Sequence, residues 1–254
     1  MASRSLGSII VSAVIVGLIA GLLVAVFHLV LTEPIIERSI EIEKSLRQIQ
    51  EATGETLLVD RNTQRGGLFL GFLMYGLTWG LLFSVTYHLV QNRLHDMSTS
   101  LRSSVLALLT GWSVALFPFL KYPANPPGVG DPETIQYRQI LYLAFIALSV
   151  VITCLAFVIQ RHLSRPSARG RSTWSKWAIV LGAYAAPALL LYTAFPPNPD
   201  AVLMPAGLVW MFRVLSFAGL ALFWIAYAAG FAWLAIRAER PERARNVTFA
   251  TKKA

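Results

Sequence analysis

The sequence predicts an all-α membrane protein, a polytopic bundle of six transmembrane helices. Of the 254 residues, 56% are hydrophobic and only 14% are charged, a composition typical of membrane proteins. A bilayer core of about 30 Å needs about 20 apolar residues of helix, and six apolar runs reach or approach this length. Since helices satisfy their own backbone groups in lipid, we predict a single integral membrane domain over residues 1–254.

The six predicted spans follow one another with short connections. The first has no Asp, Glu, Lys or Arg and is too long for the apolar region of a signal peptide. The third is short and stops at Lys121, whereas the second, fourth and sixth each follow an arginine. The fifth ends directly before a pair of prolines. The predicted bounds are 6–31, 66–90, 103–120, 140–159, 177–195 and 214–236.

The basic residues indicate the orientation of the chain in the membrane. Placing both termini in the cytoplasm puts 14 of the 22 Lys and Arg residues on that side, in agreement with the positive-inside bias. The net charge of +9 therefore records topology, and we expect no nucleic-acid partner. The basic cytoplasmic tail, residues 237–254, also has the charge to contact lipid headgroups. The six spans would then form three out-and-back hairpins.

The three turns that face outward share a pattern. They are the acidic outer loop at residues 32–65, "KYPANPPGVGDPETIQYR" and "YTAFPPNPDAVLMPAGLVWMFR", each with proline after the rising span and arginine before the descending one. "PFLKYPANPP" and "PALLLYTAFPP" agree further, since both have Pro, then Tyr, then a double proline. Proline fixes φ and restricts the residue before it, so these turns are predicted to be stiff. The pattern is either an internal repeat or ordinary turn composition.

Several acidic side chains in these turns are candidate metal ligands. Glu33 and Glu37 share one helical face at i and i+4, which suits either a solvated amphipathic helix or a surface that collects cations. Asp131 and Glu133 are typical of the start of a helix, and they could equally form a second part of the cation-collecting surface. Imidazole with carboxylates suits a borderline divalent ion such as cobalt, and a histidine in a span is a functional candidate. The predicted metal ligands are His28, Glu33, Glu37, Asp131 and Glu133.

Three arginines are predicted to be structural charge partners of these acids. Arg65, Arg138 and Arg213 each stand before a descending span, where pairing with a carboxylate would stabilise the turn. The sequence has no phosphate-binding glycine loop with lysine and no paired span histidines for haem. We therefore expect no enzymatic activity and no permanently bound cofactor.

Three stretches resemble one known family. "HLVLTEPIIERSIEIE", "GWSVALFPFLKYPANPPGVGDPETIQYRQILYL" and "APALLLYTAFPPNP" are similar to the predicted cobalt transporter subunit family CbtA. The resemblance implies a multi-pass protein of the bacterial cytoplasmic (inner) membrane, with cobalt or a related divalent cation as transported substrate. It also implies a small partner subunit, CbtB, that carries histidines. The acidic first loop and the basic tail are longer here than the family pattern.

Two functions therefore remain open at this stage. The chain is expected to be the membrane subunit of a divalent cation transporter, in contact with the lipid bilayer, with a CbtB-like subunit and with other membrane subunits. The alternative is a structural or assembly subunit of a larger membrane complex that transports nothing itself. Its support is the scarcity of charge inside the spans and the aromatic stretch "VWMFRVLSFAGLALFWIAYAAGFAW".

Overall fold

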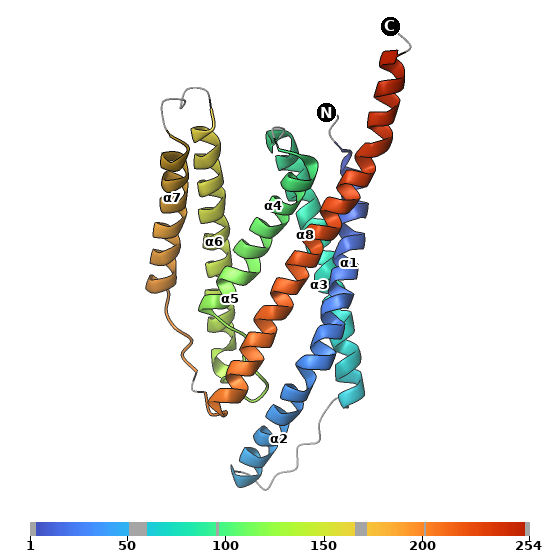
Figure 1. Cartoon of the computed structure of the whole chain (residues 1–254). Helices are drawn as coiled ribbons and strands as arrows, with labels where there is room; N and C mark the ends of the chain where they lie inside the picture. Colours follow the sequence, from blue (N-terminus) through green and yellow to red (C-terminus); the bar gives the residue numbers. More distant parts are fainter. Residues whose placement is uncertain (1–3, 51–59, 95–96, 166–171, 201, 252–254) are drawn as a thin grey trace. The chain divides into compact units, whose positions relative to one another are not determined.

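The computed structural model describes residues 4–50, 60–94, 97–165, 172–200 and 202–251. Regular structure in these residues is helical (Figure 1). A 3₁₀ turn at Gln91–Leu94 follows α3, a π-helical turn at Trp112–Leu116 joins α4 to α5, and a 3₁₀ turn at Pro132–Thr134 leads into α6. The α-helices are α1 (Leu6–Leu31), α2 (Glu33–Gln50), α3 (Arg61–Val90), α4 (Thr99–Gly111), α5 (Phe117–Lys121), α6 (Ile135–Leu163), α7 (Thr173–Ala194) and α8 (Ala206–Thr251).

Six helical stretches of the described residues are long and apolar enough to cross a membrane, which confirms the predicted all-α, six-span fold. Their bounds are Leu6–Leu31, Thr63–Leu94, Thr99–Lys121, Pro132–Leu163, Thr173–Ala194 and Ala206–Ala238. Most exceed the apolar runs because capping and polar residues extend the helices. Residues 51–59 of the acidic loop and 252–254 of the basic tail lie outside the described residues.

Local sequence signals explain where these helices begin. Ser5 and Ser172 cap α1 and α7, each accepting a hydrogen bond from a backbone N–H three residues on. The third span is one continuous rod with a π turn, in which the Phe117 N–H donates to Trp112 O. The next residue, Pro118, has no N–H to donate. A π turn holds one extra residue, so it shifts the pattern of backbone hydrogen bonds by one residue just before this proline.

The chain divides into two compact units. The first comprises residues 1–34, 47–108 and 218–254, and its centre is a close crossing of α1 and α3. A Cβ built at Gly17 would lie only 2.1 Å from the carbonyl oxygen of Gly76, and the reverse distance is the same. Only glycine permits this backbone approach. A Cβ at Gly21 would lie 2.3 Å from the carbonyl oxygen of Phe72, so the crossing depends on several glycines of α1 and α3.

An aromatic core joins α3 to the later part of α8 in this first unit. Phe83 lies 5.2 Å from Tyr227 and 5.0 Å from Phe231, between ring centroids, and both pairs are edge-to-face. This arrangement is favoured by ring quadrupoles. At one end of the core, the buried Arg102 of α4 donates from Nε to the Tyr87 hydroxyl at 3.3 Å. The aromatic core thus ends at a buried hydrogen bond between the Arg102 guanidinium and the Tyr87 hydroxyl.

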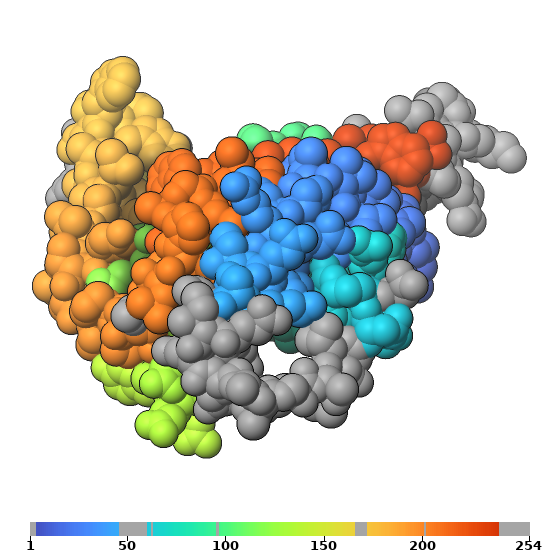
Figure 2. Space-filling model, turned by 90° about the horizontal axis from the view of Figure 1, so that it is seen from below, coloured from blue at the N-terminus to red at the C-terminus, as the bar shows by residue number. Residues whose placement is uncertain are grey.

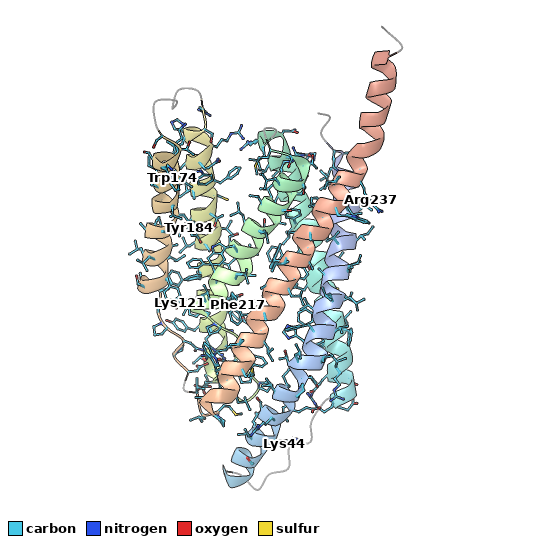
Figure 3. All side chains as sticks on the ribbon, in the orientation of Figure 1. Lys44, Lys121, Trp174, Tyr184, Phe217 and Arg237 are labelled. Carbon is cyan, nitrogen blue, oxygen red and sulfur yellow. The ribbon has the colours of Figure 1, made fainter. Side chains whose placement is uncertain are left out.

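The second unit comprises residues 35–46 and 109–217. Its core is made by α5, α6 and α7, with Phe117, Phe145, Ala188 and Leu191 buried together. Trp112 Nε1 donates to the hydroxyl of Tyr184 on α7 (labelled in Figure 3). Trp112 is partly buried, and this bond gives its indole N–H a partner away from water. This contact connects the π turn to α7.

Candidate functional site

His28 lies near the end of α1, with one ring face stacked on an aromatic side chain and one ring nitrogen bonded. Its Nδ1 is 2.8 Å from Thr32 Oγ1, and the ring stacks on Phe72 with centroids 5.0 Å apart. A Cβ at Gly219 of α8 would lie 2.2 Å from Nε2. The second ring nitrogen therefore faces the backbone of α8 at close range, and an ion bound there would have to displace that helix.

Glu33, the first residue of α2, is a buried carboxylate held by two guanidinium groups. Its Oε1 accepts from Arg61 Nη2 at 2.5 Å and from Arg65 Nε at 3.0 Å. The Glu33 side chain is 8% exposed, whereas those of Arg61 and Arg65 are 28% and 39% exposed. Charge-assisted bonds of this kind are stronger than hydrogen bonds between neutral groups. Glu33 thus fastens the start of α2 to the start of α3.

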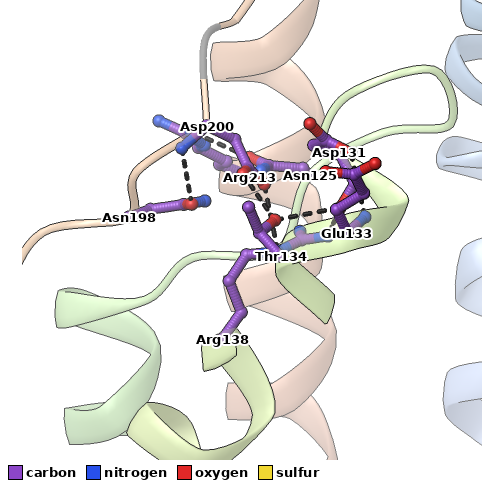
Figure 4. A network of polar contacts seen from close by, with 8 residues as sticks. All are labelled: Asn125, Asp131, Glu133, Thr134, Arg138, Asn198, Asp200 and Arg213. Atoms are coloured by element: carbon purple, nitrogen blue, oxygen red, sulfur yellow. Dashed lines mark hydrogen bonds and ion pairs between the residues drawn. The ribbon is translucent and has the colours of Figure 1, made fainter. Parts of the chain in front are cut away.

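Asp131 and Glu133 begin the helical structure that leads into α6. The Glu133 N–H donates to Asp131 Oδ1 at 2.9 Å (Figure 4), and both side chains are exposed. This bond is a helix cap. Glu133 lies in the first turn, where a negative charge interacts favourably with the helix dipole. Both carboxylates therefore keep a solvent-facing side while they start the helix.

Two proline-rich segments, which we name the second turn (residues 122–131) and the third turn (residues 195–205), are linked through the helices that follow them. A buried carboxylate connects the third turn to the start of the helical structure after the second turn. Asp200 of the third turn has Oδ2 at 3.0 Å from Arg138 Nε and Oδ1 at 2.7 Å from Thr134 Oγ1 (Figure 4). The Asp200 side chain is 2% exposed and that of Arg138 is 26% exposed. Gly130 at φ +115° leaves the space, because a Cβ there would lie 2.7 Å from the Arg138 guanidinium.

Arg213 of α8 makes a second connection between the same segments. Its Nη2 donates to Asn125 Oδ1 in the second turn at 2.7 Å. Seen from below, the second turn (yellow-green) and the third turn with the start of α8 (orange) lie side by side (Figure 2). The bond partner is an amide rather than an acid.

The middle of α2 also reaches these turns, through Glu43. A Cβ at Gly128, which has φ +79°, would lie 2.6 Å from Met204 Cε and 3.1 Å from Glu43 side-chain atoms. Gly128 is thus a point at which α2, the second turn and the third turn all meet. The positive φ and the close contacts both require glycine at this position.

The candidate residues fall into two sets. His28 and Glu33 belong to the first unit, and Glu37, Asp131 and Glu133 belong to the second. The described residues contain no group of three or more His, Cys, Asp or Glu side chains arranged to hold a metal ion. Of the arginines, Arg65 contacts Glu33 and Arg138 contacts Asp200.

Sequence reasoning missed three partners in these contacts: Arg61, Asn125 and Thr134. Arg61 stands four residues before Arg65, a spacing that places both on one helical face. This spacing was an available signal. Asn125 and Thr134 gave none, since turn residues of these types ordinarily bond their own backbone.

These observations define a multi-pass helical membrane protein whose inter-helix turns are fixed by paired charges. Over residues 6–236 the chain matches the family described as "Probable cobalt transporter subunit (CbtA)". The chain belongs to the CbtA family. No curated protein and no solved structure matches it.

Proposed function

We propose that this chain is the membrane subunit of a cobalt transporter in the bacterial inner membrane. The observation that carries the proposal is the family match, which extends over residues 6–236 and so covers five candidate spans and all but the last two residues of the sixth. In this proposal both termini are cytoplasmic and the spans form three hairpins. The second and third turns then face outward, where a cation arrives.

The carboxylates divide the work in this proposal. Glu37, Asp131 and Glu133 are exposed and attract the hydrated cation to the outer face by their charge. Glu33 contacts two arginines, so it positions the helix ends and becomes a ligand only when they release it. His28 supplies the deepest nitrogen, and it can bind the ion only when its Nε2 moves away from the backbone of α8 at Gly219. Because three protein ligands are typical of a divalent metal site, a histidine-bearing CbtB-like subunit completes the coordination.

Uptake of radioactive cobalt into cells tests this function. Cells express the chain with and without the small partner, and the variants are His28→Ala, Glu33→Gln and the pair Asp131→Asn with Glu133→Gln. We expect uptake above background only with both subunits, and a several-fold loss at low cobalt in the Asp131/Glu133 pair. Membrane levels of each variant are measured in parallel. Background uptake in every combination, with the chain properly inserted, would contradict the transport function.

One observation favours a second candidate, a structural subunit that transports nothing. The residues buried between α3 and α8 are largely aromatic, including Phe83, Tyr87, Trp224, Tyr227 and Phe231. A core of this kind excludes ions and water. Purification of the chain with its membrane partners distinguishes the two: a stable complex whose cobalt uptake survives deletion of this chain would favour the structural role.

A further inference from the structure

The ends of α5 and α7 exchange hydrogen bonds. The Tyr122 hydroxyl, just after α5, donates to the carbonyl of Pro196 at 2.7 Å, and the Tyr192 hydroxyl of α7 donates to the carbonyl of Leu120 at 3.3 Å. Each tyrosine thus reaches across to the backbone beside the other. Burial, with a smaller contribution from Tyr137, raises the pKa of the Tyr122 hydroxyl. The hydroxyl therefore remains a proton donor at neutral pH.

The two tyrosines occupy matching positions in similar sequences. In "PFLKYPANPP" and "PALLLYTAFPP", the tyrosine follows a proline by four or five residues and precedes a double proline by four. Two copies of a motif related by a two-fold axis must contact each other reciprocally. If a residue of the first copy bonds a position in the second copy, the matching residue of the second copy bonds the matching position in the first. The observed exchange is reciprocal in direction but shifted in register, since Tyr122 bonds the carbonyl four residues after Tyr192 and Tyr192 bonds the carbonyl two residues before Tyr122. The two-fold relation of the tyrosines is therefore approximate.

The arginines before the descending helices repeat the exchange. Arg138, on the helix after the second turn, pairs with Asp200 in the third turn. Arg213, on the helix after the third turn, donates to Asn125 in the second. Asn125 precedes its double proline and Asp200 follows its own, so the two-fold relation is approximate.

One further contact crosses in a single direction. Lys121 Nζ donates to the carbonyl of Tyr192 at 2.8 Å and lies 5.2 Å from the centre of that ring. Tyr192 belongs to the last turn of α7, where carbonyl groups without helical partners favour a cation. Opening the two turns would break the tyrosine, arginine and lysine contacts together.

We infer that the second and third turns are two copies of one motif, joined by reciprocal contacts across a local two-fold axis into a single cap that does not open. The statement that the cap stays closed during transport rests on the proposed function. The statement that the second and third turns form one cap rests on the contacts alone. A cation would therefore pass beside this cap and not between its two turns.

A double-mutant cycle tests the joined cap without any transport measurement. The variants are Tyr122→Phe, Tyr192→Phe and the two combined, and the melting temperature of the purified chain in detergent is measured. Each single change removes one hydroxyl and should lower the melting temperature by about 2–4 °C. Because both bonds hold the same contact, the double variant should lose clearly less than the sum. Strict additivity would overturn the single cap.

A matched control separates this coupling from any general effect of losing a phenol. Tyr137 lies at the same end of the second unit and is 47% exposed. Tyr137→Phe should change the melting temperature by less than about 1 °C, and its combination with Tyr192→Phe should be additive. Equal coupling of Tyr137 and Tyr122 to Tyr192 would contradict the reciprocal arrangement.

Cross-linking tests whether the cap opens. Thr134 and Asp200 have short side chains whose oxygens lie 2.7 Å apart, so the pair Thr134→Cys and Asp200→Cys should form a disulfide. The background is Cys154→Ala, which removes the chain's single cysteine. We expect a disulfide across the turns and cobalt uptake unchanged within two-fold on oxidation. Failure to cross-link, or uptake lost on oxidation and restored by a reductant, would overturn the inference.

The two experiments fail independently. If no variant transports cobalt in either redox state, the proposed function fails, and the melting-temperature cycle still decides whether the cap is a single unit. If the cycle is additive while uptake is robust, the transport function stands and the cap inference fails.

Discussion

Arg138 Nε lies 3.0 Å from Asp200 Oδ2, which joins the first turns of α6 to the proline-rich segment before α8. The carboxylate is almost fully buried and carries its charge between a guanidinium group and the Thr134 hydroxyl. Neither group makes a linear hydrogen bond to the other, so the attraction is chiefly Coulombic. A buried charge whose partner is removed is strongly destabilising.

We therefore predict that Asp200→Asn destabilises the protein. The change keeps the shape of the side chain but leaves Arg138 opposite a neutral amide, which should cost about 1–3 kcal/mol, less than for a fully buried pair because Arg138 is partly exposed. Thermal unfolding in detergent measures the loss. Asp131→Asn is the control, since Asp131 is exposed and asparagine caps a helix as well as aspartate does. Equal losses in both variants would contradict the prediction.

The crossing of α1 and α3 gives a second prediction. Gly76→Ala places a methyl group 2.1 Å from the Gly17 carbonyl oxygen, so the helices must separate, at a cost of about 1–3 kcal/mol or more. Gly71→Ala lies on the same helix with open space around it and should stabilise slightly, because alanine favours helix by about 1 kcal/mol. Opposite signs in thermal unfolding are expected. Two stabilising changes would show that the helices do not approach this closely.

The Glu33 cluster gives a third prediction. Glu33→Gln removes the charge that binds Arg61 and Arg65, and loss of these charge-assisted bonds should cost about 1–3 kcal/mol. Glu37→Gln, on the exposed side of the same helix, should cost less than about 0.5 kcal/mol. Chemical denaturation of both variants makes the comparison. If Glu37→Gln were the more harmful change, Glu33 would not be the anchor of α2.

The six spans could be predicted because lipid demands long apolar helices, and the runs such as 6–31 are visible without any tertiary information. The helix ends could not be set as well. α6 begins earlier than its apolar run because Asp131 and Pro132 start the helical structure. The π turn at Trp112–Leu116 has no sequence signal other than Pro118. It depends on which backbone carbonyl each N–H bonds in the folded helix, and the sequence does not indicate this.

The site was harder to predict than the fold because charge pairing depends on contacts between distant segments. The sequence predicted that Arg138 would pair with an acid of the outward turns, where Asp131, Glu133 and Asp200 stand, and did not indicate which one. The structure places Arg138 against Asp200, 62 residues further along the chain. Local spacing gives capping and i, i+4 relations, whereas this pair exists only because the second and third turns are joined.

The last prediction concerns the contact between His28 and α8. Gly219→Ala would place a Cβ 2.2 Å from His28 Nε2. The imidazole must then turn away from Thr32 and Phe72, or α1 and α8 must separate, so we expect a fall in melting temperature of several degrees. Gly207→Ala on the same helix meets nothing within 4 Å and should be neutral or slightly stabilising.

A second change tests the cause of that fall. Combining Gly219→Ala with His28→Ala removes the imidazole that the new methyl group strikes. The double variant should therefore be less destabilised than the sum of the two single variants, because the clash is present only when both the alanine at 219 and the histidine at 28 are present. Melting temperatures of the four proteins complete the cycle. A double variant that lost the full sum would mean that His28 and Gly219 do not touch, and His28 Nε2 would then be open to a metal ion.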